Sequence, residues 1–288
     1  AELAKELNMA IGITYLEGIV RAAENVVADA VLLEEESLRS ELEGLKALLG
    51  KTEFQQEEIR KAMQLAFIKG LKAADKPLRI GYKSPVACAK VIFEEALRHE
   101  GIPFGGDPSQ EGIKVQMVDV KGGGKLNVAL SGRLIDGYAG NNPFPALAVE
   151  KGMGRILCDL EDLPPGTFRN HPCCCIAARV DVIEQKPEVV IDLLALLLEA
   201  NRTINSDADK TIAAAVRWIG TSEAVERMSI PTSGYSMAAS PEWHEAMGQW
   251  ATVMNGLGVF RDRVKDKNSR EVAQIAYYFS LLEIGRAP

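Results

Sequence analysis

Residues 130–152, LSGRLIDGYAGNNPFPALAVEKG, decide the fold, because they pass from an apolar strand to a new helix within a few positions. The apolar run ends at Asp136, and Gly137, Tyr138 and the turn at 140–143 lead into a helix that proline opens. A strand that delivers an acid, an aromatic ring and two amides to the start of a helix is typical of one wall of a ligand cleft.

The segments around this stretch alternate between strand and helix patterns. Strands are predicted over 78–82, 113–120, 134–138, 155–158 and 173–180, and helices over 86–99, 125–131 and 143–151. This alternation predicts an α/β fold with a mostly parallel sheet, helices on both faces, and ligand contacts at the carboxyl ends of the strands.

The two ends of the chain carry helical patterns instead. Residues 2–74 are predicted to form three helices, and further helices are predicted over 187–204, 207–219, 222–228, 241–256 and 269–284. We therefore expect a helical N-terminal region over 1–75, an α/β ligand-binding lobe over 76–186 and a helical C-terminal region over 187–288. The N-terminal helices have more apolar residues than one small layer can bury, which predicts a homodimer held by these helices, or docking on a larger partner.

Composition and charge limit the classes of partner. The 288 residues are 47% apolar and 25% charged, with a formal net charge of -7, so neither nucleic acid nor an anionic membrane surface attracts the chain as a whole. No apolar run approaches the ~20 residues of a membrane span, and no export signal is visible. We expect a periplasmic or extracytoplasmic protein if a signal has been removed, and a cytoplasmic one otherwise.

Three contiguous cysteines, Cys173, Cys174 and Cys175, follow His171 closely. Thiolate and imidazole suit zinc, copper(I) or iron, which makes these four residues weak candidates for a metal site. On a strand, however, adjacent side chains point to opposite faces, so the expectation is buried core cysteines, less than one equivalent of metal and no cofactor.

The loops after the predicted strands have two interpretations each. Ser84-Pro85 either presents backbone N–H groups to an anion or simply caps a helix. Residues 122–124 either let the backbone approach a phosphate or sulfate or form a flexible strand-to-helix turn, and the turn is favoured because the nucleotide-binding patterns are missing. Asp136 and Tyr138 either bind hydroxyl or amine groups of a ligand, or the carboxylate caps the following loop. A carboxylate at this place would repel a plain oxyanion.

Three segments resemble the second lobe of the periplasmic binding proteins that serve nitrate, sulfonate, taurine and bicarbonate ABC transporters. They are RIGYKSPVACAKVIFEEALRHEGI (79–102), VALSGRLIDGYAGNNPFPALAVEKGMGRIL (128–157) and HPCCCIAARVDVIEQKPEVVIDLLALLLEANRTIN (171–205). The resemblance implies a lobe of the type II periplasmic-binding-protein kind with added N-terminal and C-terminal helices, a small-molecule ligand and an ABC transporter permease as partner. It also implies ligand contacts from Ser84, Pro85, Val86, Asp136, Tyr138, Asn141, Asn142 and His171.

The chain departs from that family in its first part, because helices over 1–74 stand where the family has the α/β segment of its first lobe. The cysteine stretch is also similar to the CCCFC motif of the fungal thiamine-pyrimidine synthases, but Ala177 replaces the last cysteine. The reacting His and Lys of those enzymes have no counterpart, so an enzyme is not expected. The alternatives to a ligand-binding component are a helical oligomeric scaffold without ligand and a metal-dependent enzyme of this kind.

Overall fold

The computed structural model of the chain describes residue 65 and residues 68–73, 76–176, 178–237, 240–268 and 270–272. Most of the predicted N-terminal helices and most of the predicted helix over 269–284 lie outside the described residues, so these predictions are not tested. The chain divides into two compact units, Ala1–Pro165 and Gly166–Pro288. The predicted boundaries after residues 75 and 186 stay a prediction.

The first unit contains a four-stranded sheet with strand order β2-β3-β1-β4. The strands are β1 (Leu78–Tyr82), β2 (Phe104–Gly105), β3 (Val115–Asp119) and β4 (Gly137–Tyr138), and every pairing is parallel. From residue 76 on, the helices of this unit are α4 (Cys88–His99), α5 (Leu126–Ser131) and α6 (Phe144–Glu150), with the short 3-10 helices Gly123–Lys125 and Leu160–Asp162. Residues 68–73, before the sheet, are also helical. The α/β fold with a parallel sheet is therefore confirmed.

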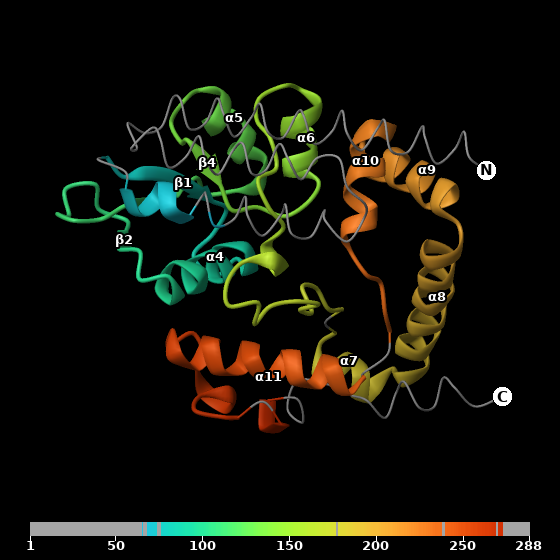
Figure 1. Cartoon of the computed structure of the whole chain (residues 1–288). Coiled ribbons are helices and arrows are strands. Elements are labelled where there is room, and N and C mark those ends of the chain that lie inside the picture. Colours follow the sequence, from blue (N-terminus) through green and yellow to red (C-terminus); the bar gives the residue numbers. More distant parts are fainter. Residues whose placement is uncertain are drawn as a thin grey trace, which may run out of the picture. The chain divides into compact units, whose positions relative to one another are not determined.

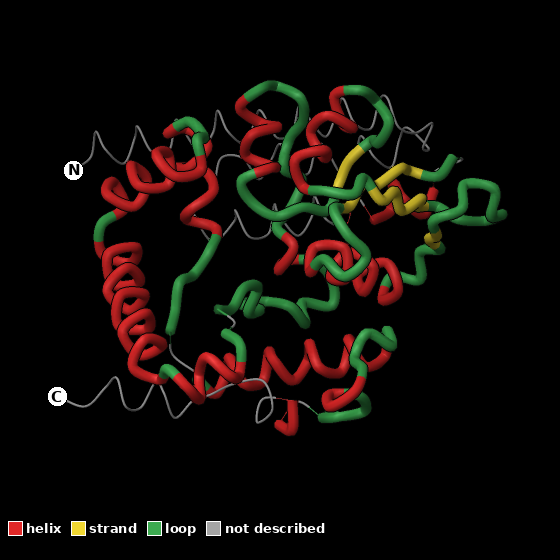
Figure 2. Tube along the Cα trace, turned by 180° about the vertical axis from the view of Figure 1, so that it is seen from behind, coloured by secondary structure: helices red, strands yellow, loops and turns green. Residues whose placement is uncertain are grey.

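Helices cover both faces of this sheet. The chain leaves β1 through α4 and enters first β2 and then β3, both on one side of β1. It leaves β3 through α5 and returns to β4 on the other side of β1. A crossover between parallel strands is right-handed in nearly all proteins. Because the two crossovers run across the sheet in opposite directions, this rule places α4 and α5 on opposite faces. Figure 1 shows α4 below β1 and α5 and α6 above it, and in Figure 2 the strands form one yellow group.

The core of the first unit lies between the sheet and these helices. Its most deeply buried large side chains are Val91 and Ile92 of α4, Val115 of β3, Leu126 of α5 and Ile135 before β4. Gly81 of β1 is part of this packing, since a Cβ atom there would lie 2.6 Å from Cδ1 of Ile135. A fully buried Leu or Ile stabilises by about 1.5–3 kcal/mol, so these side chains fix the sheet to its helices.

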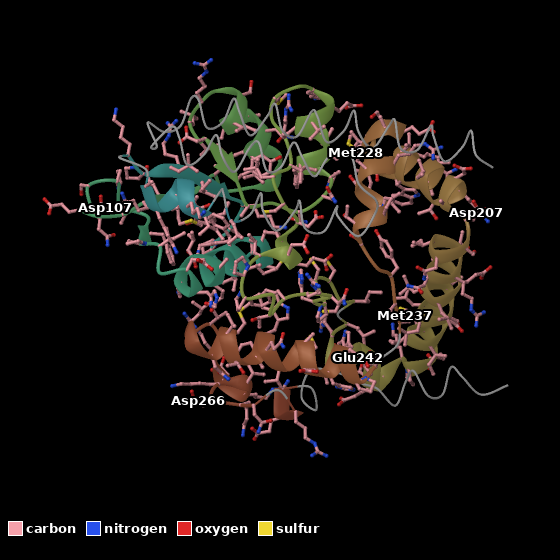
Figure 3. All side chains as sticks on the ribbon, in the orientation of Figure 1. Asp107, Asp207, Met228, Met237, Glu242 and Asp266 are labelled. Atoms are coloured by element: carbon pink, nitrogen blue, oxygen red, sulfur yellow. The ribbon has the colours of Figure 1, made fainter. Side chains whose placement is uncertain are left out.

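The second unit is helical in its described part. It contains α7 (Val180–Gln185), α8 (Pro187–Ser206), α9 (Ala208–Ile219), α10 (Glu223–Ser229) and α11 (Pro241–Gly256), with 3-10 helices at Ile230–Thr232 and Asp262–Val264. Each of three helices starts at a side-chain cap: Asp207 accepts from the Lys210 amide, Ser222 from the Val225 amide and Ser240 from the Trp243 amide. Figure 3 labels Asp207 at the turn between α8 and α9.

Two predicted strands do not form. Residues 154–159 are irregular, and the segment 171–176 is irregular before α7 begins at Val180. A strand needs a neighbour that pairs its N–H and C=O groups, and β4 pairs with β1 over only two residues, which leaves little regular edge for another strand. The apolar patterns at 155–158 and 173–180 were therefore wrong as strand predictions.

Among the described residues, none of the helices combines the length and the apolar character that crossing a membrane requires.

Candidate functional site

The carboxyl ends of β1, β3 and β4 lie side by side, because the strands are parallel and in register. Tyr82 at the end of β1 is level with Asp119 at the end of β3, and Gly81 is level with Tyr138 of β4. The chain leaves these strands through residues 83–87, 120–125 and 139–143, which together we call the carboxyl edge.

Backbone hydrogen bonds tie the loops of the carboxyl edge to one another. The amide of Val120 donates to the carbonyl of Tyr82 over 3.1 Å, and the amide of Gly122 donates to the carbonyl of Lys83 over 3.0 Å. On the other side, the amide of Ala139 donates to the carbonyl of Gly81 over 3.0 Å. Side chains on these loops therefore start from fixed backbone positions.

Lys83 and Asn141 connect the loops after β1 and β4. The Lys83 ammonium donates to Oδ1 of Asn141 over 3.0 Å, and the pair is partly buried. Asn141 is among the ligand contacts predicted from the sequence, whereas Lys83 is not. A basic residue directly after a predicted strand of a parallel sheet was the available signal, since such a position lies at the carboxyl edge.

Tyr138 holds α5 and α6 to the end of β4. Its hydroxyl donates to Oδ1 of Asn127 over 2.8 Å, and Nδ2 of Asn127 donates to the carbonyl of Phe144 over 3.0 Å. Burial raises the pKa of Tyr138 above its usual value, so the phenol stays protonated at neutral pH. Asn142 follows in the same loop and is half-buried.

The glycine turn 122–124 is explained by backbone geometry. Gly122 has φ of 138°, which side chains rarely adopt, and a Cβ on Gly123 would lie 2.4 Å from Cε2 of Phe144. Gly124 has open space around it. Two of the three glycines are thus required by the turn from β3 into α5, as the turn interpretation predicted.

Ser84 does not cap the helix that follows it, so the capping interpretation of Ser84-Pro85 is wrong. The helix starts at Cys88, its N-cap is Ala87, and no side chain bonds to the cap. The carbonyl of Ser84 instead accepts from the amide of Ala87 over 3.1 Å, which closes a turn on which Pro85 and Val86 are exposed. This four-residue turn, 84–87, lies between β1 and α4, so the helix begins only at Cys88.

Asp136 is not at the carboxyl edge, and the structure does not bring it together with Ser84 and Asn142 as predicted. It precedes β4 and lies level with Arg79, near the start of β1. Arg79 donates to it from Nη2 (2.6 Å), from Nε (3.0 Å) and from its backbone amide (2.9 Å). The hydrogen bond from the Arg79 side chain lowers the pKa of Asp136, and this paired carboxylate faces the guanidinium rather than the loops after the strands.

Charges of both signs lie at or next to the carboxyl edge. Its basic residues are Lys83, Lys121 and Lys125. Next to it, Asp119, the last residue of β3, supplies a carboxylate whose Oδ1 accepts from the amide of Lys121 over 2.9 Å. Burial, with contributions from Asp119 and Glu94, raises the pKa of Tyr82. The arrangement offers a cationic donor, an anionic acceptor and amide groups to a small polar molecule.

His171 belongs to the second unit, where aromatic side chains hold it. Its Nδ1 lies 2.8 Å from the carbonyl of Phe168, and because a carbonyl only accepts, Nδ1 carries the hydrogen. The ring lies edge-on to Phe168 and to Trp250, at centroid distances of 6.3 Å and 5.8 Å.

The three cysteines are exposed, which corrects the expectation of buried core residues on a strand. The segment 171–176 is irregular, so the alternation of a strand does not separate neighbouring side chains there. The Sγ atoms of Cys173 and Cys174 lie 3.8 Å apart.

Comparison with known proteins gives one finding. A family model described as the NMT1-like family matches residues 7–220, which includes most of the predicted N-terminal helical region and all of the carboxyl edge. No curated protein and no solved structure matches the chain.

Proposed function

Because the chain belongs to the NMT1-like family, of nitrate, sulfonate and taurine ABC substrate-binding proteins and thiamine-pyrimidine synthase-like proteins, we propose that it binds a small anionic or zwitterionic molecule at the carboxyl edge. The coarse assignment, a substrate-binding protein related to those of ABC transporters, rests on the family match over 7–220.

The hydrogen bond from Lys83 to Asn141 is the observation that supports the proposed position of the site. It joins the loops after β1 and β4 at the place where open parallel sheets bind their ligands. The Lys83 ammonium group has three N–H donors, so its hydrogen bond to Asn141 leaves it able to donate to a ligand as well. Ser84 and Asn142 lie on the same two loops and would add contacts.

The class of ligand follows from the charges. With Asp136 paired to Arg79 near the start of β1, the objection that its carboxylate would repel an oxyanion no longer holds. Lys83 attracts an anionic group, and a charge-assisted hydrogen bond is worth about 1.5–3 kcal/mol. Asp119 provides a counterpart for an amine, so a sulfonate or carboxylate that also carries an amine satisfies both charges.

Three further features of this function remain proposals. Delivery of the ligand to an ABC transporter permease is proposed from the family, and so is a periplasmic or extracytoplasmic location. A homodimer through the N-terminal helices is proposed from the apolar pattern of residues 2–74, which lies largely outside the described residues.

A thermal-shift screen tests the proposed function. The purified chain is heated with single compounds at millimolar concentration: nitrate, bicarbonate, taurine, an alkyl sulfonate without an amine, an alkyl amine without an acid, and a neutral sugar. A ligand stabilises by RT ln(1 + [L]/Kd), about 2.7 kcal/mol at a hundredfold excess over Kd, which shifts the melting temperature by several degrees. Shifts with anionic or zwitterionic compounds support the proposal, whereas a shift with the sugar or the amine alone contradicts it.

A further inference from the structure

We propose that Cys173 and Cys174 form a thiol–disulfide exchange site that reacts with low-molecular-weight disulfides such as oxidised glutathione. This modification site lies in the second unit and does not depend on the ligand proposed above. Its product is a reversible disulfide bond between two neighbouring residues.

Geometry brings the two thiols together. The segment that carries them is irregular, both side chains are exposed, and their Sγ atoms lie 3.8 Å apart. A disulfide has its sulfur atoms about 2.05 Å apart, so side-chain rotation and a small change of the backbone must bring the atoms closer by less than 2 Å. Exposure of both thiols gives a reagent of tripeptide size access to them.

His171 is placed to assist the reaction. One of its ring nitrogens lies within 4.8 Å of Sγ of Cys173. The hydrogen bond from Nδ1 to the carbonyl of Phe168 leaves Nε2 as the acceptor of the neutral ring, and the edge-on contacts with Phe168 and Trp250 hold the ring. An imidazole beside a thiol takes its proton, or stabilises the thiolate as imidazolium, and the thiolate is the nucleophile in exchange.

The reaction balances in two steps. The Cys173 thiolate attacks one sulfur of the disulfide R–S–S–R, so that a mixed disulfide forms and one thiolate RS⁻ leaves. The Cys174 thiolate then attacks the Cys173 sulfur of the mixed disulfide, and the second RS⁻ leaves. Two protein thiols are oxidised to one disulfide, R–S–S–R is reduced to two RSH, and the protons of the protein thiols end on the leaving groups.

The covalent constraint makes this bond easy to reduce again. Consecutive Cα atoms are about 3.8 Å apart, whereas the Cα atoms of ordinary disulfides are about 4.4–6.8 Å apart. A disulfide between neighbours is therefore strained, and strained, exposed disulfides have the higher reduction potentials of labile rather than structural bonds. The site thus suits reversible exchange.

Cys158 in the first unit provides an internal comparison. Burial and the neighbouring carboxylates of Asp159 and Asp162 raise the pKa of its thiol to about 12. Almost no thiolate forms there at neutral pH, so Cys158 should react far more slowly than the exposed pair.

The experiment treats the full-length, reduced protein with oxidised glutathione and follows intact mass and peptide maps. The wild type is expected to lose two hydrogens in mass, with the link mapped between Cys173 and Cys174 and with Cys158 unmodified. In Cys174→Ser the glutathione adduct on Cys173 is expected to persist at least about tenfold longer, because the neighbouring thiol acts at millimolar or higher effective concentration. Cys175→Ser is the matched control and should form the link as the wild type does.

The other outcomes overturn the proposal. They are a wild-type protein that does not react, an adduct equally short-lived in wild type and Cys174→Ser, and a link that involves Cys175 or another cysteine. Circular dichroism of each variant before oxidation confirms that it is folded, and Ser is well tolerated at exposed positions.

Discussion

At the scale of single residues, Lys83 and Asp136 determine how the charge of the first unit is distributed. Lys83 follows the last residue of β1, and its ammonium group bonds to Asn141 across the carboxyl edge. Asp136 precedes β4 and bonds to Arg79 near the start of β1. The sheet therefore keeps a paired charge near the beginning of its strands and a cationic donor at their end, where a ligand is proposed to bind.

The pair of Asp136 and Arg79 predicts a pH-dependent contribution to stability. The pKa of Asp136 is lowered in the folded protein, so its stabilisation is present above the unfolded value of about 3.9 and is lost as pH falls through the folded value. Because the two side chains are 35% and 38% exposed, solvent screening reduces the contribution to about 1 kcal/mol. Asp136→Asn should lower the free energy of unfolding in urea by about this amount at pH 7 and by less at pH 3, which is below the unfolded pKa.

Asp181→Asn is the matched control for this prediction. Asp181 also bonds to an arginine, Arg179, but only two residues away and at an exposed place, so the contact adds little to folding. Equal losses in the two variants at pH 7, or a loss in Asp136→Asn that is as large at pH 3, would refute the assigned role of the Arg79 contact.

The residue scale also shows where sequence reasoning succeeded and where it did not. The loops that carry Ser84 and Asn141 follow the strand pattern directly, so their position at the carboxyl edge was predictable. The position of Asp136 was not, because it depends on the register of β4 against β1, and a shift of two residues moves a side chain from one end of a short strand to the other. The partner of Asp136 was equally invisible in the sequence.

At the scale of elements, the turn from β3 into α5 shows how a glycine run acts through packing. Gly123→Ala places a Cβ 2.4 Å from Cε2 and 2.6 Å from Cζ of Phe144 at the start of α6. Overpacking of this kind costs about 1–3 kcal/mol, so we expect a lower melting temperature. Gly124→Ala, with open space around the new Cβ, is the control and should be neutral or slightly stabilising.

Differential scanning calorimetry of both variants decides this prediction. Gly123→Ala that melts as the wild type does would mean that Phe144 does not pack on the turn, and the geometry proposed for the loops after β3 and β4 would lose its support. The measurement is specific because the two substitutions differ by one position and add the same methyl group.

Several elements were predicted well because the fold supplies neighbours that pair with them or pack on them. The strand over 78–82, the helix over 241–256 and the helix over 207–219 correspond closely to β1, α11 and α9. The segments 155–158 and 173–180 have comparable apolar patterns, but among the described residues they pair with no strand, and pairing is a property of the whole sheet rather than of the segment. That error also produced the wrong expectation that adjacent cysteines diverge.

At the scale of the whole molecule, the family model matches residues 7–220. The match includes the α/β sheet and the segments of the chain before and after it. The dimer remains a prediction from sequence, since residues 2–64 lie outside the described residues. Light scattering at micromolar concentration should give twice the mass of the chain, and Leu42→Glu with Leu45→Glu should give a monomer. Glu41→Gln with Glu43→Gln is the control, and a wild-type monomer would contradict the prediction.

Isothermal titration with the best ligand from the thermal screen tests the proposed binding site most directly. Lys83→Met and Asn142→Ala should each weaken binding about ten- to a hundredfold, the equivalent of about 1.5–3 kcal/mol, because each removes a contact at the carboxyl edge. Asp136→Asn should bind as the wild type does, since this carboxylate faces Arg79 near the start of β1. Wild-type affinity in both Lys83→Met and Asn142→Ala, or weakened binding in Asp136→Asn alone, would contradict a ligand site at the carboxyl ends of the strands.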